Sequence, residues 1–151
     1  MRELLRAQER HIPAVLALET ECFSRPWSEQ SFLFEQKSPD AHFTVCEEDG
    51  ALAGFCILHR LCDEGELFNL AVAPAFRRRG VASQLLADAL SASPALGIRR
   101  VYLEVRQSNA AARALYEKHG FCICGVRRRY YDDPKEDALL MEAELSAPAD
   151  G

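Results

Sequence analysis

The sequence has no apolar run long enough to cross a membrane or to form the core of a secretory signal. The opening stretch, Met1 to Arg6, mixes charged and apolar side chains. Internal repeats, low-complexity segments and linkers are lacking as well. We therefore expect a cytoplasmic protein without membrane contact, built as one domain over residues 1–145 and followed by a flexible tail over residues 146–151.

An excess of basic charge is lacking, since 18 Lys and Arg against 23 Asp and Glu give a net charge of -5. Sequence-independent nucleic-acid binding rests on clustered basic charge, and an acidic chain does not favour it, so direct nucleic-acid binding is not expected. Zinc-ligand spacing is lacking too, because no paired Cys-x-x-Cys knuckles occur and the histidines are not grouped around the cysteines. We expect no bound metal, and cysteines that serve as small buried hydrophobes in a reducing cytoplasm. The cysteines are Cys22, Cys46, Cys56, Cys62, Cys122 and Cys124.

Apolar residues, 48% of the chain, recur at spacings that predict both helices and strands. The expected elements are helices over 9–23 and 28–38, strands on either side of a turn within 42–62, a strand over 66–73, a helix over 80–93, a strand over 99–106, a helix over 109–119, and strands over 121–131 and 137–145. The order ααβββαβαββ indicates an α/β domain with a mixed sheet and helices on both faces. The strand over 66–73 is mostly apolar on both faces, as expected of a central strand.

A strand, a basic loop and a helix that begins at a glycine follow one another between Leu70 and Ala82. A helix N-terminus presents unpaired N–H groups and the positive end of the helix dipole, which favour a pyrophosphate. Gly80 and Ala82 leave the backbone accessible, and the arginines at 77–79 add positive charge. The spacing matches neither the Walker pattern nor the dinucleotide-binding pattern. The alternative is a solvated basic loop before an amphipathic helix.

This segment, Arg77-Arg78-Arg79-Gly80-Val81-Ala82 after a strand ending in Val-Ala-Pro, resembles the acetyl-CoA loop of the GNAT acetyltransferases. The family pattern is Arg/Gln-x-x-Gly-x-Gly/Ala. The resemblance implies acetyl-CoA as cosubstrate, a loop that cradles its pyrophosphate, and a strand bulge near Leu70 to Val72 that exposes backbone N–H groups. The cofactor-binding residues that it implies are Leu70, Ala71, Val72, Arg77, Arg78, Arg79, Gly80, Val81, Ala82, Ser83, Asn109 and Tyr116.

A second segment, Asn109 to Phe121, matches the pattern Asn-x-x-Ala-x-x-Leu-Tyr-x-x-x-Gly-Phe of the family helix that lies against the cofactor thiol. The whole chain from Arg2 to Leu145 is similar to one branch of the family, the RimI type, which acetylates the N-terminal alanine of a ribosomal small-subunit protein. The resemblance therefore implies the N-terminal peptide of a ribosomal protein as partner. The further segments that carry it are Cys22–Ser28, Glu66–Val72 and Arg127–Tyr131.

Transfer of an acetyl group to an amine requires a base, because a protonated amine has no lone pair with which to attack the thioester. A peptide α-amine has a pKa of about 7.7–8.0, so a carboxylate or a water relay suffices. Glu104 is the candidate base, and an exposed glutamate on a polar strand face is the alternative. The resemblance makes Tyr116 the acid that protonates the departing thiolate, against the alternative of a core tyrosine. The Val72 N–H is the expected oxyanion donor.

The resemblance also implies that Trp27 and Tyr131 line the groove for the acceptor peptide, although aromatic packing in a turn explains Trp27 equally well. The run Arg127–Arg129 is interpreted as strand surface. Four acidic residues on the first two expected helices are solvated or attract a basic peptide: Glu19, Glu21, Glu29 and Glu35.

Two other functions stay open. The same enzyme class could act on a lysine side chain, a polyamine or another small amine, although a lysine amine, with a pKa of about 10.4, demands stronger deprotonation. A non-catalytic CoA-binding module is the third possibility. Such a module needs neither Glu104 nor Tyr116.

Overall fold

The computed structural model describes residues 1–132 and 135–145, with the side chains of Arg129, Tyr131, Asp132 and Lys135 left out. The tail over 146–151 lies outside the described residues. The helices are α1 (Ile12–Cys22), α2 (Glu29–Lys37), α3 (Val81–Ala92) and α4 (Ala110–Lys118). The strands are β1 (Arg2–Arg6), β2 (Ala41–Glu48), β3 (Ala51–Leu61), β4 (Glu64–Val72), β5 (Arg100–Arg106), β6 (Cys122–Asp132) and β7 (Lys135–Glu144).

All seven strands form one sheet in the order β1-β2-β3-β4-β5-β7-β6. Neighbouring strands are antiparallel except β4 and β5, which are parallel and are joined through α3. This parallel pairing is short, because only Glu64–Glu66 pair with Arg100–Tyr102. β4 continues to Val72 and β5 continues to Arg106, so the two strands separate in the middle of the sheet.

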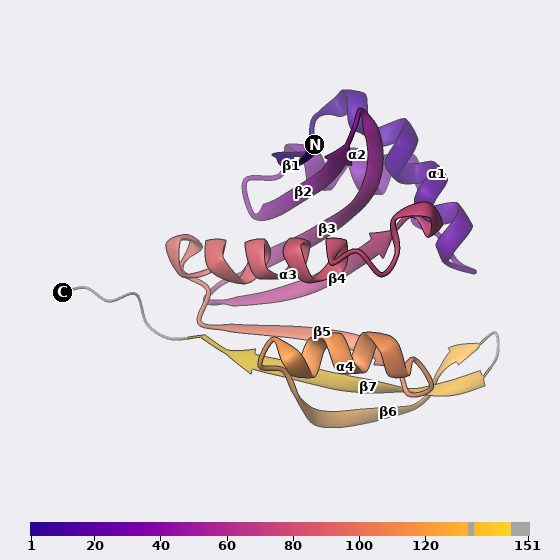
Figure 1. The fold of residues 1–151 in the computed structure, drawn as a ribbon. Helices are drawn as coiled ribbons and strands as arrows, with labels where there is room; N and C mark the ends of the chain where they lie inside the picture. Colours follow the sequence, from indigo (N-terminus) through magenta and orange to yellow (C-terminus); the bar gives the residue numbers. More distant parts are fainter. Residues whose placement is uncertain (133–134, 146–151) are drawn as a thin grey trace.

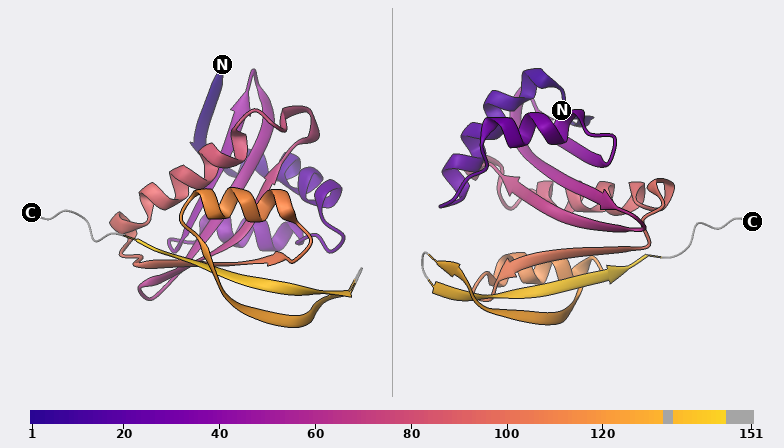
Figure 2. Two further views of the ribbon diagram at one scale, coloured as in Figure 1. Left: turned by 60° about the horizontal axis from the view of Figure 1, so that its bottom comes forward. Right: turned by 180° about the vertical axis from the view of Figure 1, so that it is seen from behind.

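Two apolar cores lie on opposite faces of this sheet. α3 and α4 cover one face, where Leu85 and Leu86 pack with residues such as Val101 and Met141. α1 and α2 cover the other face over β2, β3 and β4, with Phe32 packed among Phe43 and Phe55. Figure 2 shows that, in the described part of the chain, no helix lies over β5, β7 and β6 on this second face. That half of the sheet is therefore open to an approaching molecule.

Local capping explains where two of the helices begin. The Ser28 hydroxyl accepts a hydrogen bond from Ser31 N at 3.2 Å, and Asn109 Oδ1 accepts one from Ala112 N at 3.1 Å. Both side chains satisfy an N–H group that has no partner inside its helix. The predicted caps of these two helices are confirmed.

The α/β class with helices on both faces is confirmed, and the structure adds one strand to the predicted order. β1 precedes α1 and pairs antiparallel with β2 at the sheet edge. The expectation that β4 is a central strand is confirmed, although Glu64, Glu66 and Phe68 are exposed, so the strand is not fully buried on both faces. No helix of the described residues is long and apolar enough to span a membrane.

Candidate active site

The site is centred on the point where β4 and β5 part. Tyr102 is the last residue of β5 that pairs with β4, and Glu104 follows two positions later on the same face. Val101, Leu103 and Val105 face the other way and are buried under α4. Strand alternation therefore turns Glu104 away from the core and towards the open face.

β4 also presents free backbone groups where it parts from β5. Ala73 N donates to Ala53 O at 2.8 Å, and alternate residues of an antiparallel strand point to opposite sides. Ala71 therefore pairs with β3, while Leu70 and Val72 direct their N–H and C=O groups away from β3. The expected bulge at Leu70–Val72 is misplaced: the register irregularity lies between Leu67 and Asn69, opposite Ile57 and Leu58.

The loop after β4 ends in an exposed helix N-terminus. Gly80 caps α3 with a φ of 81°, in the left-handed region that favours glycine. The first bond of the helix runs from Gln84 N to Gly80 O at 3.0 Å, so the N–H groups of Val81, Ala82 and Ser83 have no partner within the helix. These free donors and the helix dipole are the features on which the predicted pyrophosphate site depends.

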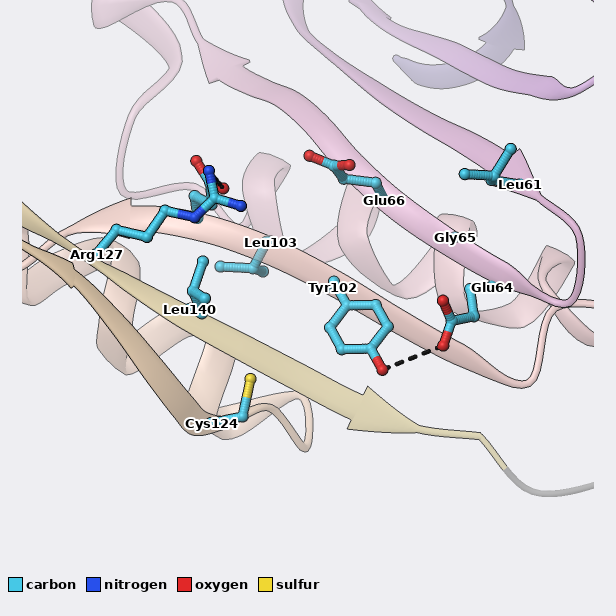
Figure 3. A pocket seen from close by; sticks show the side chains of 10 residues that line it. Leu61, Glu64, Gly65, Glu66, Tyr102, Leu103, Cys124, Arg127 and Leu140 are labelled. Atoms are coloured by element: carbon cyan, nitrogen blue, oxygen red, sulfur yellow. Dashed lines mark hydrogen bonds and ion pairs between the residues drawn. The ribbon is translucent and has the colours of Figure 1, made fainter. Parts of the chain in front are cut away.

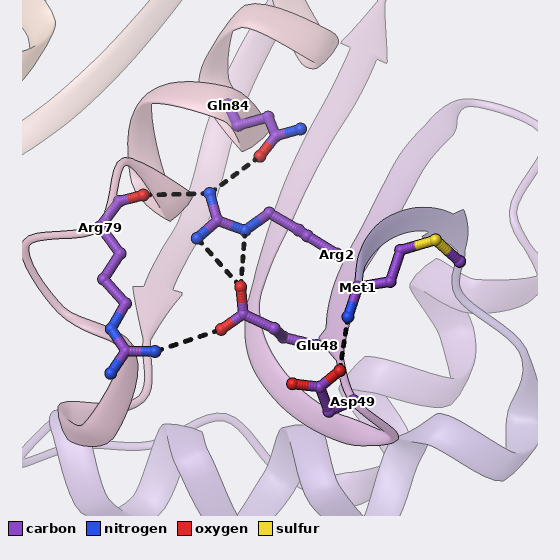
Figure 4. Close-up of polar contacts among 6 residues, drawn as sticks. All are labelled: Met1, Arg2, Glu48, Asp49, Arg79 and Gln84. Carbon is purple, nitrogen blue, oxygen red and sulfur yellow. Dashed lines mark hydrogen bonds and ion pairs between the residues drawn. The ribbon is translucent and has the colours of Figure 1, made fainter.

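The three arginines of this loop differ in their contacts. Arg77 Nε donates to Val72 O at 3.2 Å and ties the loop to the end of β4. Arg79 pairs with Glu48 at 3.4 Å, and its carbonyl accepts from Arg2 at 3.0 Å (Figure 4). Arg78 is exposed, has a φ of 64°, and forms no ion pair with any residue that the structure describes. Of the three guanidinium groups, that of Arg78 is therefore the one left for a phosphate.

Helix α4 is joined to the N-terminal turn of α3 through Ser83 and His119, whose Oγ and Nε2 atoms are 2.8 Å apart. Desolvation and then Lys118 lower the pKa of His119, which favours the neutral ring in this contact. Tyr116 lies on the core side of α4, is 9% exposed and packs against the Phe121 ring at 5.8 Å. The predicted acid is thus a largely buried tyrosine in the core under α4, the position that the alternative of a core tyrosine requires.

Glu104 lines a cavity of about 270 Å³ on the open face, shown in Figure 3. β4 contributes Glu64 and Glu66 to this cavity, and β5 contributes Tyr102 and Glu104. The Tyr102 hydroxyl donates to Glu64 at 3.2 Å. A protonated amine that entered this cavity would meet carboxylates at the point where β4 and β5 separate. A carboxylate base, together with free strand N–H groups that can stabilise an oxyanion, can support acyl transfer to an amine.

Comparison with known proteins agrees with this geometry. The model of the acetyltransferase (GNAT) family matches residues 12–121. The chain belongs to the GNAT acetyltransferase family. A protein of Bacillus subtilis named a putative [ribosomal protein bS18]-alanine N-acetyltransferase is 38% identical over 131 residues, covering 86% of this chain and 87% of that protein.

Two further relatives are the N-alpha-acetyltransferase RimI of Mycobacterium tuberculosis and the ribosomal-protein-S18-alanine N-acetyltransferase of Escherichia coli. The first is 37% identical over 128 residues, covering 82% of this chain and 79% of its own. The crystal structure of the second has a TM-score of 0.90 at 33% identity and covers 100% of this chain and 98% of its own. The resemblance to RimI-type GNAT proteins is thereby confirmed.

In this GNAT protein, Arg127 and Tyr130 interact with the candidate base Glu104, an interaction that no sequence pattern predicted. Arg127 Nη1 is 3.3 Å from Glu104 Oε1, and the Arg127 side chain is 54% exposed on β6, in keeping with the interpretation of this arginine as strand surface. A hydrogen bond to Glu104 is the main cause that raises the pKa of Tyr130. Partial desolvation and then Glu104 raise the pKa of Glu66, a third residue that the patterns missed. Their one sequence signal was the segment Arg127–Tyr131 shared with the RimI type.

The two residues expected to line the acceptor groove, Trp27 and Tyr131, differ in how far the structure describes them. The Trp27 ring lies 5.5 Å from that of Phe68, which stacks on His59 at 5.3 Å, so Trp27 reaches the open face of β4. Trp27 also packs on Phe32 at 5.4 Å, as the alternative of aromatic packing in a turn requires. The Tyr131 side chain lies outside the described part of the structure.

Several surface expectations need correction. Glu19 and Glu35 are neither solvated nor free to attract a peptide, being 2% and 5% exposed. Glu35 is 2.7 Å from His59 Nδ1. Among the cysteines only Cys46 and Cys56 are buried, whereas Cys62, Cys122 and Cys124 are exposed, so the expectation that all are buried is wrong. A hydrophobic neighbourhood in sequence does not ensure burial on an open sheet face.

Proposed function

We propose that this protein transfers the acetyl group of acetyl-CoA to the N-terminal α-amine of a ribosomal small-subunit protein that begins with alanine. The observation that carries the proposal is the Glu104 carboxylate in a cavity at the point where β4 and β5 separate, in a domain whose helix α3 begins at Gly80 with free N–H groups. Relatives in Bacillus subtilis and Escherichia coli are named for this reaction. The proposal places the reaction in the cytoplasm and requires no contact with membrane or nucleic acid.

On the cofactor side, the N–H groups of Val81, Ala82 and Ser83 would bind the pyrophosphate, and the Arg78 guanidinium would add charge-assisted hydrogen bonds. Arg77 and Arg79 would act indirectly, since their side chains hold the loop against Val72 and Glu48. Asn109, which caps α4, would also contact the cofactor at the edge of the site.

On the strand side, the N–H groups of Leu70 and Val72 would bind the pantetheine and acetyl portions, with Ala71 supplying a small side chain between them. The Val72 N–H would donate to the oxygen that becomes negative as the amine attacks. A donor fixed in a strand stabilises that charge without reorganising during the reaction.

Glu104 would accept the proton of the α-ammonium, directly or through a water molecule, which frees the lone pair for attack on the thioester carbon. Tyr116 would donate a proton to the departing sulfur. A thiol has a pKa of about 8.5, so the thiolate leaves with moderate ease even without that proton. We therefore assign the larger share of catalysis to Glu104. Trp27 and Tyr131 complete the proposal as residues that line the acceptor groove.

The proposal is tested by CoA release from acetyl-CoA with short peptides that differ only at the first residue. A peptide with a blocked N-terminus and an internal lysine, together with spermidine, completes the panel. We expect turnover with free α-amines, highest for alanine, and none when the terminus is blocked. Turnover with lysine or spermidine alone would keep the cofactor and refute the acceptor. CoA binding without any turnover would indicate a binding module instead.

A further inference from the structure

We propose that Arg127 and Tyr130 are positioning residues for the transfer: reaching over from β6, they hold the Glu104 carboxylate in one orientation. This inference rests on the proposed role of Glu104. It concerns residues that stand two strands away from the base, because β7 lies between β5 and β6.

The three side chains form a closed set of contacts. Arg127 Nη1 lies 3.3 Å from Glu104 Oε1, and the Tyr130 hydroxyl is hydrogen-bonded to Glu104. The guanidinium carbon of Arg127 lies 5.4 Å from the centre of the Tyr130 ring, within cation–π distance. Figure 3 shows Arg127 reaching from β6 towards β5. Each of the two β6 residues thus contacts both the carboxylate and the other.

An irregularity of β6 brings these residues to one face. In a regular strand, residues three positions apart point to opposite faces. Arg127 pairs with Ala138 and Tyr131 pairs with Glu136, so four steps along β6 match two steps along β7. The extra residues interrupt the regular alternation of side chains along β6. Arg127 and Tyr130 therefore both reach Glu104 instead of pointing to opposite faces. Such bulges re-aim side chains next to active sites.

The charges around Glu104 explain why it needs this support. Glu64 and Glu66 from β4 line the same cavity, where Arg127 is the cation among the described lining residues. Positive charge on His59 from β3 opposes the rise in the pKa of Glu66. Tyr102 from β5 and Cys124 from β6 contribute further polar lining to the cavity. Like charges disfavour ionisation, whereas a nearby guanidinium favours it. Arg127 offsets the repulsion between Glu66 and Glu104.

The arrangement leaves Glu104 able to act as a base. A carboxylate has about four lone-pair positions, and the contacts with Arg127 and Tyr130 use only part of them. Glu104 is 22% exposed in its side chain, so an incoming ammonium group can reach the remaining positions. Arg127 is 54% exposed, so solvent reaches its side chain as well.

The first test is independent of catalysis. Carbon-13 NMR of labelled glutamate follows the Glu104 carboxyl through a pH titration, with Glu104→Gln to assign its resonance. Arg127→Gln is expected to move the Glu104 titration midpoint upward by about 0.5–1 pH unit, since Arg127 is partly screened by solvent. Arg128→Gln is the matched control, because Arg128 is exposed and forms no ion pair within the described residues. An unchanged midpoint in Arg127→Gln would overturn the inference even if the parent protein acetylates its peptide.

The second test uses the pH profile of kcat/KM with an alanine-starting peptide. Arg127→Gln is expected to shift the acidic limb upward and lower kcat/KM about tenfold below pH 7, with a smaller loss above it. Arg127→Lys restores the charge and is expected to recover the limb in part. Tyr130→Phe keeps the ring and is expected to lower kcat more than it raises KM. A uniform loss at every pH, or a gain of activity in Arg127→Gln, would contradict a positioning role.

Discussion

The side-chain nitrogen of Asn69 on β4 lies 3.0 and 3.2 Å from the two carboxylate oxygens of Glu19 on α1. Glu19 also accepts a hydrogen bond from Trp27 N at 2.9 Å. One carboxylate, only 2% exposed, therefore joins α1, the turn before α2 and the irregular part of β4. This contact fixes the backbone of Trp27 beside the irregular part of β4.

Glu19→Ala is expected to lower the free energy of unfolding by about 3 kcal/mol, because two buried donors lose a charged acceptor. Chemical denaturation measures the loss. Glu21→Ala is the control, since Glu21 is exposed on the same helix. Equal stability of the two variants would show that the buried network contributes little.

Much of the fold could be predicted from the chain, and its misses have identifiable causes. Helical periodicity and the caps Ser28 and Asn109 located the helices well. β1 was missed because Leu4 and Leu5 stand between charged residues. A short edge strand of this kind is ordered by its backbone pairing with a neighbour, here β2. Local spacing carries no information about such a partner.

The candidate site also divides into parts that the sequence suggests and parts that it does not. Glu104 and the loop before α3 could be proposed because each lies in a short, continuous motif. The contact between Glu104 and Arg127 depends on the pairing of β5, β7 and β6 and on the extra residues in β6. A shift of one residue in a strand moves every side chain to the other face, so this neighbourhood could not be derived from the sequence.

Arg78→Gln is expected to raise KM for acetyl-CoA about tenfold, because the variant loses a cation without an internal partner. Arg79→Gln is the matched comparison and is expected to raise it less, since its guanidinium is committed to Glu48. A tenfold change corresponds to about 1.4 kcal/mol. Initial rates at low salt measure both values, and added salt should reduce the Arg78 effect. Equal effects would contradict the distinction between the two side chains.

Gly80→Ala is expected to weaken acetyl-CoA binding and to destabilise the fold by about 1 kcal/mol, because an alanine is strained at a φ of 81°. No atom lies within 4 Å of an added Cβ, so the cost is conformational rather than steric. Gly50→Ala in the β2–β3 turn is the control, with a φ of 85° and equally open space. It should share the destabilisation but keep the affinity for CoA measured by calorimetry.

His11 gives a pH dependence of stability. It is 4% exposed, its Nδ1 accepts from Gln8 N at 2.9 Å, and burial lowers its pKa. Because the folded-state pKa lies below the unfolded value of about 6.5, this contribution is complete above about pH 6.5 and is lost as the pH falls below it and through the folded-state pKa. Denaturation at pH 7.5 and 5.5 should show a smaller loss for His11→Asn than for the parent. An identical loss would assign the effect to other groups.

The measurement that tests the central claim most directly is the turnover of Glu104→Gln with an alanine-starting peptide, taken together with its affinity for CoA. We expect kcat to fall by about a hundredfold or more, since general-base catalysis contributes about 10²–10⁴-fold, while the affinity for CoA stays within about twofold of the parent. Glu144→Gln, at the exposed end of β7, controls for the loss of a carboxylate. Turnover equal to the parent's would contradict the assignment of Glu104 as the base.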